Sequence, residues 1–161
     1  MLVEFKSLPD HSKVWIYQCN RRFTEEELVS VRTKNSEFLE NWSAHGTSLQ
    51  AGFEIKYERF IIIAVNQDQQ SATGCSIDAS VRFIQELERD LGVELMDKMN
   101  VAFKQGEFVN FKSLLDFKQM AKSGAIGKKT IVFNNLVTNI AEYNDNWEVP
   151  ASESWHSRFF N

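Results

Sequence analysis

Two consecutive strand patterns near the middle of the chain constrain the fold more than any other feature. Between residues 49 and 57 every odd-numbered residue is apolar, while the even-numbered residues are polar or glycine. A period of two is typical of a strand with one buried face. The continuous apolar run of residues 60–65 follows after a short gap. The two segments therefore predict an antiparallel hairpin that turns around Glu58 and Arg59.

A helix is predicted before this hairpin. Thr24 is followed by three glutamates, and Glu27 stands three positions after it, which is the capping-box pattern of a helix start. Apolar residues then recur at steps of three and four as far as Trp42. Gly46 is the expected stop, and His45 is expected in the last turn.

A second long helix is predicted after the polar loop of residues 67–74. Ser76 is its expected N-cap and Gly92 its expected end. The apolar residues that repeat at helical spacing are Ile77, Val81, Ile84, Leu87 and Leu91.

The remaining segments complete an α+β pattern. We expect an early strand at residues 14–19, a second hairpin at 99–111, a helix at 113–123 closed by Gly124, and a strand at 130–133. The order predicts an antiparallel sheet with two main helices on one face, and the ferredoxin-like split β-α-β arrangement is one topology that fits it. We expect a single domain over residues 1–161, with 147–161 as an irregular aromatic tail docked on its body.

Charge and hydropathy exclude several classes of partner. The 161 residues include 18 basic and 22 acidic side chains, a net charge of −4, so no nucleic acid partner is expected. The longest apolar run, residues 60–65, is far below the roughly 20 residues of a membrane span. The first ten residues lack the basic-then-apolar order of a signal peptide, which indicates a cytoplasmic protein.

The two cysteines, Cys19 and Cys75, predict neither a disulfide framework nor a metal site. They form no C-x-x-C pair, and the histidines are not clustered, so no metal and no cofactor are expected. Cys19 follows an apolar strand and is interpreted as a core residue.

The start of the second helix is the most interesting candidate site. Cys75 is expected just before a helix whose free amides stabilise a thiolate or a bound anion, and Gly74 and Ser76 are candidate ligand-binding residues beside it. In a catalytic interpretation Cys75 is the nucleophile, His45 the general base and Asp78 a polar orienting group. In the structural interpretation the same residues are a glycine turn, a small thiol and a helix cap.

Two further residues are candidates for ligand binding. Arg21 can hold a carboxylate or phosphate in bidentate fashion, and Trp42 can form part of a stacking wall. The alternatives are a solvated strand end for Arg21 and core packing for Trp42.

The glycine-rich segment at residues 124–130 is not a phosphate loop. Only two residues separate its glycines, where that motif needs four, and Lys129 stands where a serine or threonine should follow Lys128. We interpret the segment as a capped turn with two solvated lysines.

The C-terminal residues carry more aromatic surface than a free terminus exposes, because Trp147, Trp155 and two phenylalanines fall within them. We expect this tail to dock on its own domain, with a homodimer contact as the alternative.

Five segments of the chain resemble a family of small bacterial proteins of undefined function, many of which are labelled ABC-transporter ATPases. They are VWIYQ (14–18), WSAHG (42–46), GCSIDASV (74–81), IVFNNLV (131–137), and VPA (149–151) with SWH (154–156). The resemblance implies a bacterial cytoplasmic protein, and it supplies no catalytic residues.

The functional expectation is a cytoplasmic binding or protein-interaction module without catalysis of its own, for an unknown protein or small-molecule ligand. The alternative is a small enzyme that uses the thiol or anion site at Cys75 and Ser76 with His45. ATP hydrolysis is not expected, because the phosphate loop is absent.

Overall fold

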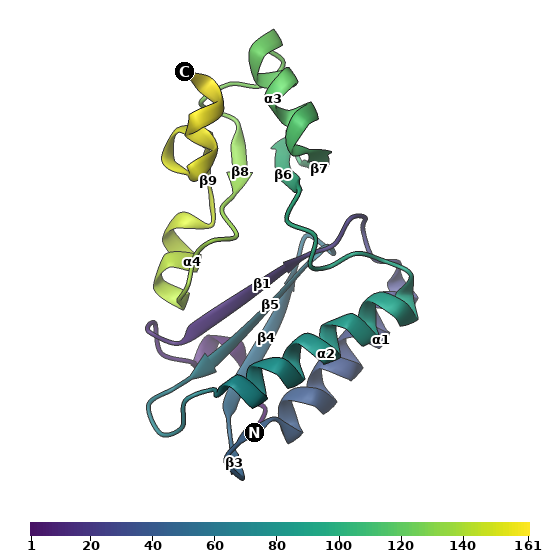
Figure 1. Ribbon diagram of the computed structural model, residues 1–161, viewed down its shortest axis with the longest axis vertical. Helices are drawn as coiled ribbons and strands as arrows, with labels where there is room; N and C mark the ends of the chain where they lie inside the picture. Colours follow the sequence, from purple (N-terminus) through teal and green to yellow (C-terminus); the bar gives the residue numbers. More distant parts are fainter. The chain divides into compact units, whose positions relative to one another are not determined.

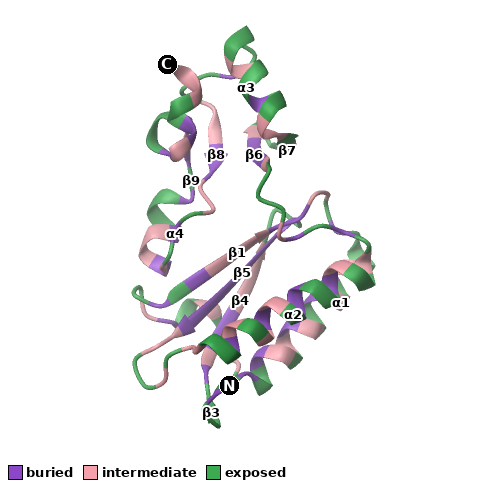
Figure 2. Cartoon of the chain, in the orientation of Figure 1, coloured by how far each residue is buried: buried purple, intermediate pink, exposed green.

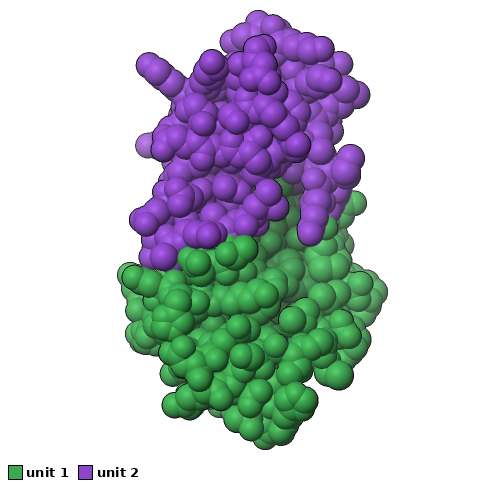
Figure 3. Space-filling view, turned by 60° about the vertical axis from the view of Figure 1, so that its left-hand side comes forward, with its two compact units in different colours: residues 1–96, 138–140 green, residues 97–137, 141–161 purple.

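The computed structural model describes residues 1–161 and forms two compact units (Figure 3). Unit 1 comprises residues 1–96 and 138–140, and unit 2 comprises residues 97–137 and 141–161. Each unit combines an antiparallel sheet with helices, which confirms the α+β class. The expectation of a single domain over residues 1–161 stays a prediction.

The sheet of unit 1 contains the predicted central hairpin. Its strands β1 (Lys13–Gln18), β4 (Gln50–Lys56) and β5 (Phe60–Asn66) are antiparallel in the order β1-β5-β4. Lys56 pairs with Phe60 across the turn. The central strand β5 is buried over its first six residues (Figure 2), as a strand covered on both faces should be.

Two long antiparallel helices, α1 (Glu25–Asn41) and α2 (Gly74–Leu91), cover one face of this sheet (Figure 1). Thr24 and Glu27 form the predicted capping box at the start of α1, and Gly92 ends α2 in the left-handed conformation. In the core beneath the helices, alternate residues of β5 pack against the apolar faces of α1 and α2. Its members include Ile61, Ile63, Val65, Leu28, Val31, Leu39, Ile84 and Leu87.

The predicted end of the first helix at Gly46 is wrong. The helix ends at Asn41, and β2 (Ser43–Ala44) and β3 (Thr47–Ser48) form a small hairpin whose turn is His45 and Gly46, with φ angles of 51° and 76°. Two residues with positive φ are typical of a tight hairpin turn. His45 is therefore a turn residue and does not lie at a helix end.

The predicted N-cap of the second helix is also wrong. Thr73 is the N-cap, and the helix begins at Gly74. The Ser76 hydroxyl accepts a hydrogen bond from the Thr73 amide at 2.6 Å, while the Thr73 hydroxyl accepts from the Ser76 amide at 3.3 Å. Ser76 thus takes the third helical position of a capping box, where glutamate or glutamine is the usual residue.

Short segments pair with both edges of the unit 1 sheet. At the β4 edge, the amide of Val3 donates to the carbonyl of Ala51 at 2.9 Å. At the β1 edge, the amide of Val14 donates to the carbonyl of Thr138 at 3.0 Å, and the amide of Ile140 donates to the carbonyl of Ser12 at 3.0 Å. These segments satisfy backbone groups that an edge strand otherwise leaves open.

Unit 2 contains a second sheet that the sequence did not indicate. Its four antiparallel strands, in the order β7-β6-β8-β9, are β7 (Phe108–Ser113), β6 (Asn100–Gln105), β8 (Ile131–Phe133) and β9 (Glu148–Pro150). Strand β6 pairs with β7 and β8 and takes no part in the β1-β5-β4 sheet. The ferredoxin-like arrangement is therefore not confirmed.

The helices of unit 2 include the predicted α3 (Leu114–Ser123), with Ser113 as N-cap and Gly124 as its left-handed end. The asparagine-rich stretch after β8, for which the sequence analysis gives no element, contains α4 (Ile140–Asn146). None of the helices combines the length and the apolar character that crossing a bilayer requires.

The aromatic residues near the C-terminus pack inside unit 2. The 3₁₀ helix η3 (Trp155–Phe160), which follows the short η2 (Ala151–Glu153), packs against α3. At the centre lies Phe117, which is fully buried, with ring centroids 5.5 Å from Phe159 and 5.7 Å from His156. Burial, together with nearby Arg158, lowers the pKa of His156 to about 4.

Candidate functional site

The start of α2 is a helix cap in which the amides of Thr73 and Ser76 already have partners. Gly74 and Cys75 are exposed, whereas Ser76 is 4% exposed. The amides of Thr73 and Ser76 are both bound by side-chain hydroxyls of the capping box. These are two of the donors that an anion at a helix start would use.

The three residues of the catalytic interpretation, Cys75, His45 and Asp78, do not interact with one another in the structure. Cys75 lies in the first turn of α2, not before it, while His45 lies in the β2–β3 turn. No hydrogen bond or ion pair links Cys75, His45 and Asp78, and all three are exposed. A nucleophilic thiol needs a base within hydrogen-bond reach, and this arrangement does not supply one.

The two cysteines should differ sharply in their reaction with iodoacetamide. Cys19 is fully buried and burial raises the pKa of its thiol, whereas Cys75 is exposed. We expect Cys75 to react readily in the native protein and Cys19 to react at least about a thousandfold more slowly, because its modification requires opening of the fold. Mass spectrometry of timed samples measures both rates. The variant Cys75→Ser is the control, and rapid labelling of that variant would contradict the prediction.

Arg21 is engaged in the fold and lies far from Cys75. Its guanidinium donates to both carboxylate oxygens of Glu27 at 2.7 and 2.8 Å, and to the carbonyl of Leu91 at 3.1 Å. The hydrogen bonds from Arg21, with a smaller effect of the Thr24 amide, lower the pKa of Glu27 to about 2. Leu91 and Gly74 are the two ends of α2, about 25 Å apart at 1.5 Å per residue.

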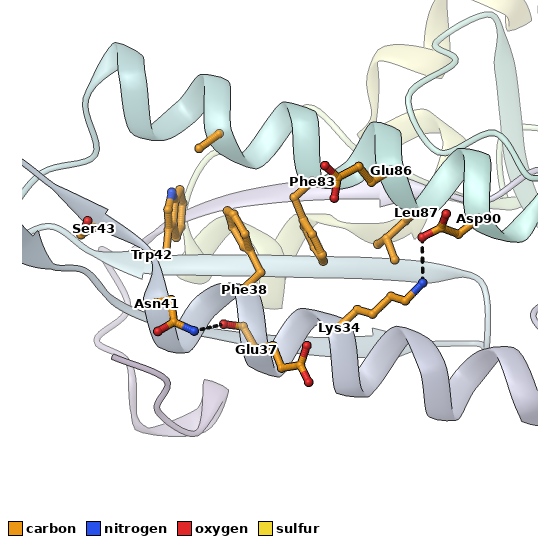
Figure 4. A pocket seen from close by; sticks show the side chains of 11 residues that line it. Lys34, Glu37, Phe38, Asn41, Trp42, Ser43, Phe83, Glu86, Leu87 and Asp90 are labelled. Carbon is orange, nitrogen blue, oxygen red and sulfur yellow. Dashed lines mark hydrogen bonds and ion pairs between the residues drawn. The ribbon is translucent and has the colours of Figure 1, made fainter.

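Trp42, a predicted ligand-binding residue, lines a pocket. The pocket is a groove between α1 and α2 with a volume of about 550 Å³ (Figure 4). The residues that line it are Lys34, Glu37, Phe38, Asn41, Trp42, Ser43, Ala79, Phe83, Glu86, Leu87 and Asp90.

Aromatic rings form the floor of this groove. The rings of Phe38 and Phe83 are stacked with centroids 4.5 Å apart and planes 5° from parallel. The Trp42 ring lies 5.5 Å from Phe38, and its Nε1–H donates to the carbonyl of Ser76 at 2.8 Å. The hydrogen bond and the stacking hold the three rings in fixed positions between the two helices (Figure 4).

The groove has one acidic end and one apolar end. Lys34 on α1 binds Asp90 on α2 at 2.8 Å. Between this ion pair and the stacked rings lie Glu37 and Glu86, whose exposed carboxylates take part in none of the ion pairs. At the opposite end the helices present Trp42 and Ala79. The arrangement suits a ligand with an apolar part and a positive charge.

Sequence reasoning missed most of this groove. Of its residues the sequence predicts only Trp42 as a candidate; Phe38 falls on the apolar stripe of α1, which indicates packing, and no sequence pattern singles out Phe83, Glu37 or Glu86. The available signal was the pair Glu37-Phe38, where an acidic residue precedes an aromatic one at the edge of the stripe. A single helix pattern does not show which stripe residues a second helix leaves accessible.

The other sequence features do not form a second site. Gly124 ends α3 with a φ of 80°, and Lys128 and Lys129 are exposed. Both observations agree with the interpretation of residues 124–130 as a capped turn with two solvated lysines. The chain contains no cluster of three metal-ligating side chains. No family model, curated protein or solved structure matches the chain.

Proposed function

We propose that this chain is a binding module without catalysis of its own, and that its ligand site is the groove between α1 and α2. The observation that carries the proposal is the pairing of an aromatic floor with two carboxylates, those of Glu37 and Glu86, that have no cationic partner. The ligand class is an amphipathic cation: an alkyl or aryl ammonium, or a lysine or arginine side chain next to an apolar one.

Two forces favour such a ligand. The apolar part removes the exposed surface of Phe38 and Ala79 from water, which contributes about 25 cal/mol for each Å² buried. The cation gains from the carboxylates and from the aromatic faces, about 0.2–1 kcal/mol for each exposed contact. Lys34 does not oppose it strongly, because Asp90 neutralises its charge.

The test uses three probes of equal chain length: hexylammonium, hexanol and hexanoate. The indole N–H of Trp42, identified by its loss in Trp42→Phe, reports binding in ¹H–¹⁵N NMR titrations. We expect hexylammonium to shift this signal with a dissociation constant in about the millimolar range, hexanol to bind more weakly and hexanoate most weakly. In Glu37→Gln/Glu86→Gln the affinity for hexylammonium should fall about three- to tenfold, with hexanol unchanged.

The control variant is Glu94→Gln/Glu107→Gln, which removes the same charge at exposed positions outside the groove. It should retain hexylammonium binding. Equal affinities for the three probes, or unchanged binding in Glu37→Gln/Glu86→Gln, would refute cation recognition. Failure of every probe to shift the Trp42 signal would refute the site itself.

Two further proposals rest on the sequence alone. One is the cytoplasmic location, and the other is the resemblance to bacterial proteins labelled as ABC-transporter ATPases. The enzymatic alternative at Cys75 gains no support from the positions of His45 and Asp78, which make no bond to it. It predicts loss of an activity in Cys75→Ser, whereas the binding module predicts unchanged hexylammonium affinity in that variant.

A further inference from the structure

Helix α3 of unit 2 exposes a surface with the opposite character to the groove. Leu115, Lys118 and Lys122 stand at spacings of three and four residues, so they share one face of the helix. Leu115 is 65% exposed. Met99, also 65% exposed, lies beside this end of the helix, since its carbonyl accepts the amide of Leu114 at 3.0 Å. The α3 face is thus apolar at its start and basic toward its end.

The lysines of the α3 face have no partners within the chain. Lys118 and Lys122 are exposed and take part in none of the ion pairs. The charged residues of the whole chain are divided in a similar way, since acidic residues predominate in unit 1 and basic residues slightly predominate in unit 2. Unit 1 has 10 basic against 15 acidic residues, and unit 2 has 8 against 7. Contact between unit 1 of one molecule and unit 2 of another is therefore electrostatically favoured.

We infer that the natural occupant of the groove is the α3 face of a second copy of this chain. This inference rests on the proposed function and names its ligand. Leu115 and Met99 meet the apolar end at Trp42 and Ala79, while the α3 lysines lie over the acidic end. The lengths agree, because Leu115 to Lys122 spans about 10 Å of helix and Lys34 to Trp42 spans about 12 Å.

Reciprocal exchange gives a closed dimer. If each copy places its α3 face in the groove of the other, the two contacts are equivalent and a two-fold axis relates them, so the assembly stops at two chains. Two lysines and two apolar side chains per groove make a small contact, which indicates a weak and salt-sensitive dimer. The carboxylates of Glu37 and Glu86 supply the specificity, because a like charge placed opposite them is repelled.

Sedimentation velocity of the full chain tests this inference, with samples from about 5 to about 500 µM, which brackets weak affinities. We expect a monomer–dimer equilibrium whose dissociation constant rises at least about tenfold between low and high salt. The charge reversals Glu37→Lys/Glu86→Lys and Lys118→Glu/Lys122→Glu should each weaken the dimer at least about tenfold. An equimolar mixture of the two variants should dimerise again, because each groove of the mixed dimer then faces an α3 surface of opposite charge.

Controls separate the inference from general charge effects and from the proposed function. Glu94→Lys/Glu107→Lys makes the same change of charge outside both surfaces and should leave the dimer intact. A chain that stays monomeric over the whole range, or a dimer that survives both charge reversals, would overturn the inference. If hexylammonium still shifts the indole N–H signal of Trp42 in such a monomer, the proposed function stands, and only the second copy as occupant of the groove is refuted. If hexylammonium does not shift the Trp42 signal either, the inference and the proposed function are both refuted.

Discussion

Replacing Phe117 with alanine is expected to lower the free energy of unfolding by about 3–5 kcal/mol, the usual cost of removing a fully buried phenylalanine. The ring has no exposed surface and lies at the centre of the unit 2 aromatic cluster. Its edge contacts reach Phe103 in β6 and Phe159 and Phe160 in the tail, at 5.5, 5.5 and 6.2 Å between centroids. Urea denaturation followed by circular dichroism measures the loss.

The same variant should release the C-terminal helix η3 from α3. Burial is the main cause that holds the pKa of His156 down to about 4, and the Phe117 ring is part of that burial. We therefore expect the pKa of His156 to rise toward about 6.5 in Phe117→Ala, as measured by NMR titration. Phe108→Ala is the matched control, since Phe108 is 76% exposed and its loss should change stability by less than about 0.5 kcal/mol. Equal losses in the two variants would contradict the buried position of Phe117.

Gly52→Ala should destabilise unit 1 by about 2–3 kcal/mol, because it overpacks a contact between two backbone segments. A Cβ at Gly52 would lie 2.8 Å from the carbonyl oxygen of Val3 and 3.1 Å from both the nitrogen and the Cα of Phe5. Backbone atoms cannot rotate away as a side chain does, so the N-terminal segment must move off β4. The midpoint of urea denaturation measures the effect.

The control for this prediction is Gly74→Ala in the first turn of α2. A Cβ at Gly74 meets no atom within 4 Å. Because alanine is the better helix former, the stability of that variant should stay unchanged or rise by up to about 1 kcal/mol. If Gly52→Ala behaves in the same way, the N-terminal segment does not pack on β4 as the structure shows.

Local patterns predicted the elements whose signals lie within a few residues. The hairpin of β4 and β5 follows from alternation in one segment and continuous apolar character in the next, and the start of α1 follows from Thr24 and Glu27. Gly92 and Gly124 end their helices as expected, because each takes the left-handed conformation that glycine adopts without strain.

The errors arose where distant contacts outweigh local preference. The spacing of Trp42 fits a continued helix, but its indole binds the carbonyl of Ser76, 34 residues away, and the chain turns into the β2–β3 hairpin. Thr73 and Ser76 are both competent N-caps, and only their reciprocal hydrogen bonds decide between them. Strand β6 has an ordinary strand pattern, which carries no information about the sheet it joins.

The candidate site was predictable only in part. The sequence predicts Trp42 as a stacking residue, and Trp42 does line the groove. The groove itself results from the antiparallel contact of α1 and α2, in which Phe38 meets Phe83 across 45 positions of sequence. No pattern within either helix reveals that contact, so Glu37 and Glu86 were not recognised as its acidic end.

The pairing of residues 138–140 with β1 has a consequence for how the chain is made. When Met96 leaves the ribosome, every other part of unit 1 has been synthesised, yet the backbone groups of Ser12 and Val14 still await partners about forty residues downstream. At usual rates of translation this interval lasts about 2–8 seconds. During it the nascent sheet has an open border that a neighbouring nascent chain can occupy, so chaperone demand and misassembly should be greatest at this stage of synthesis.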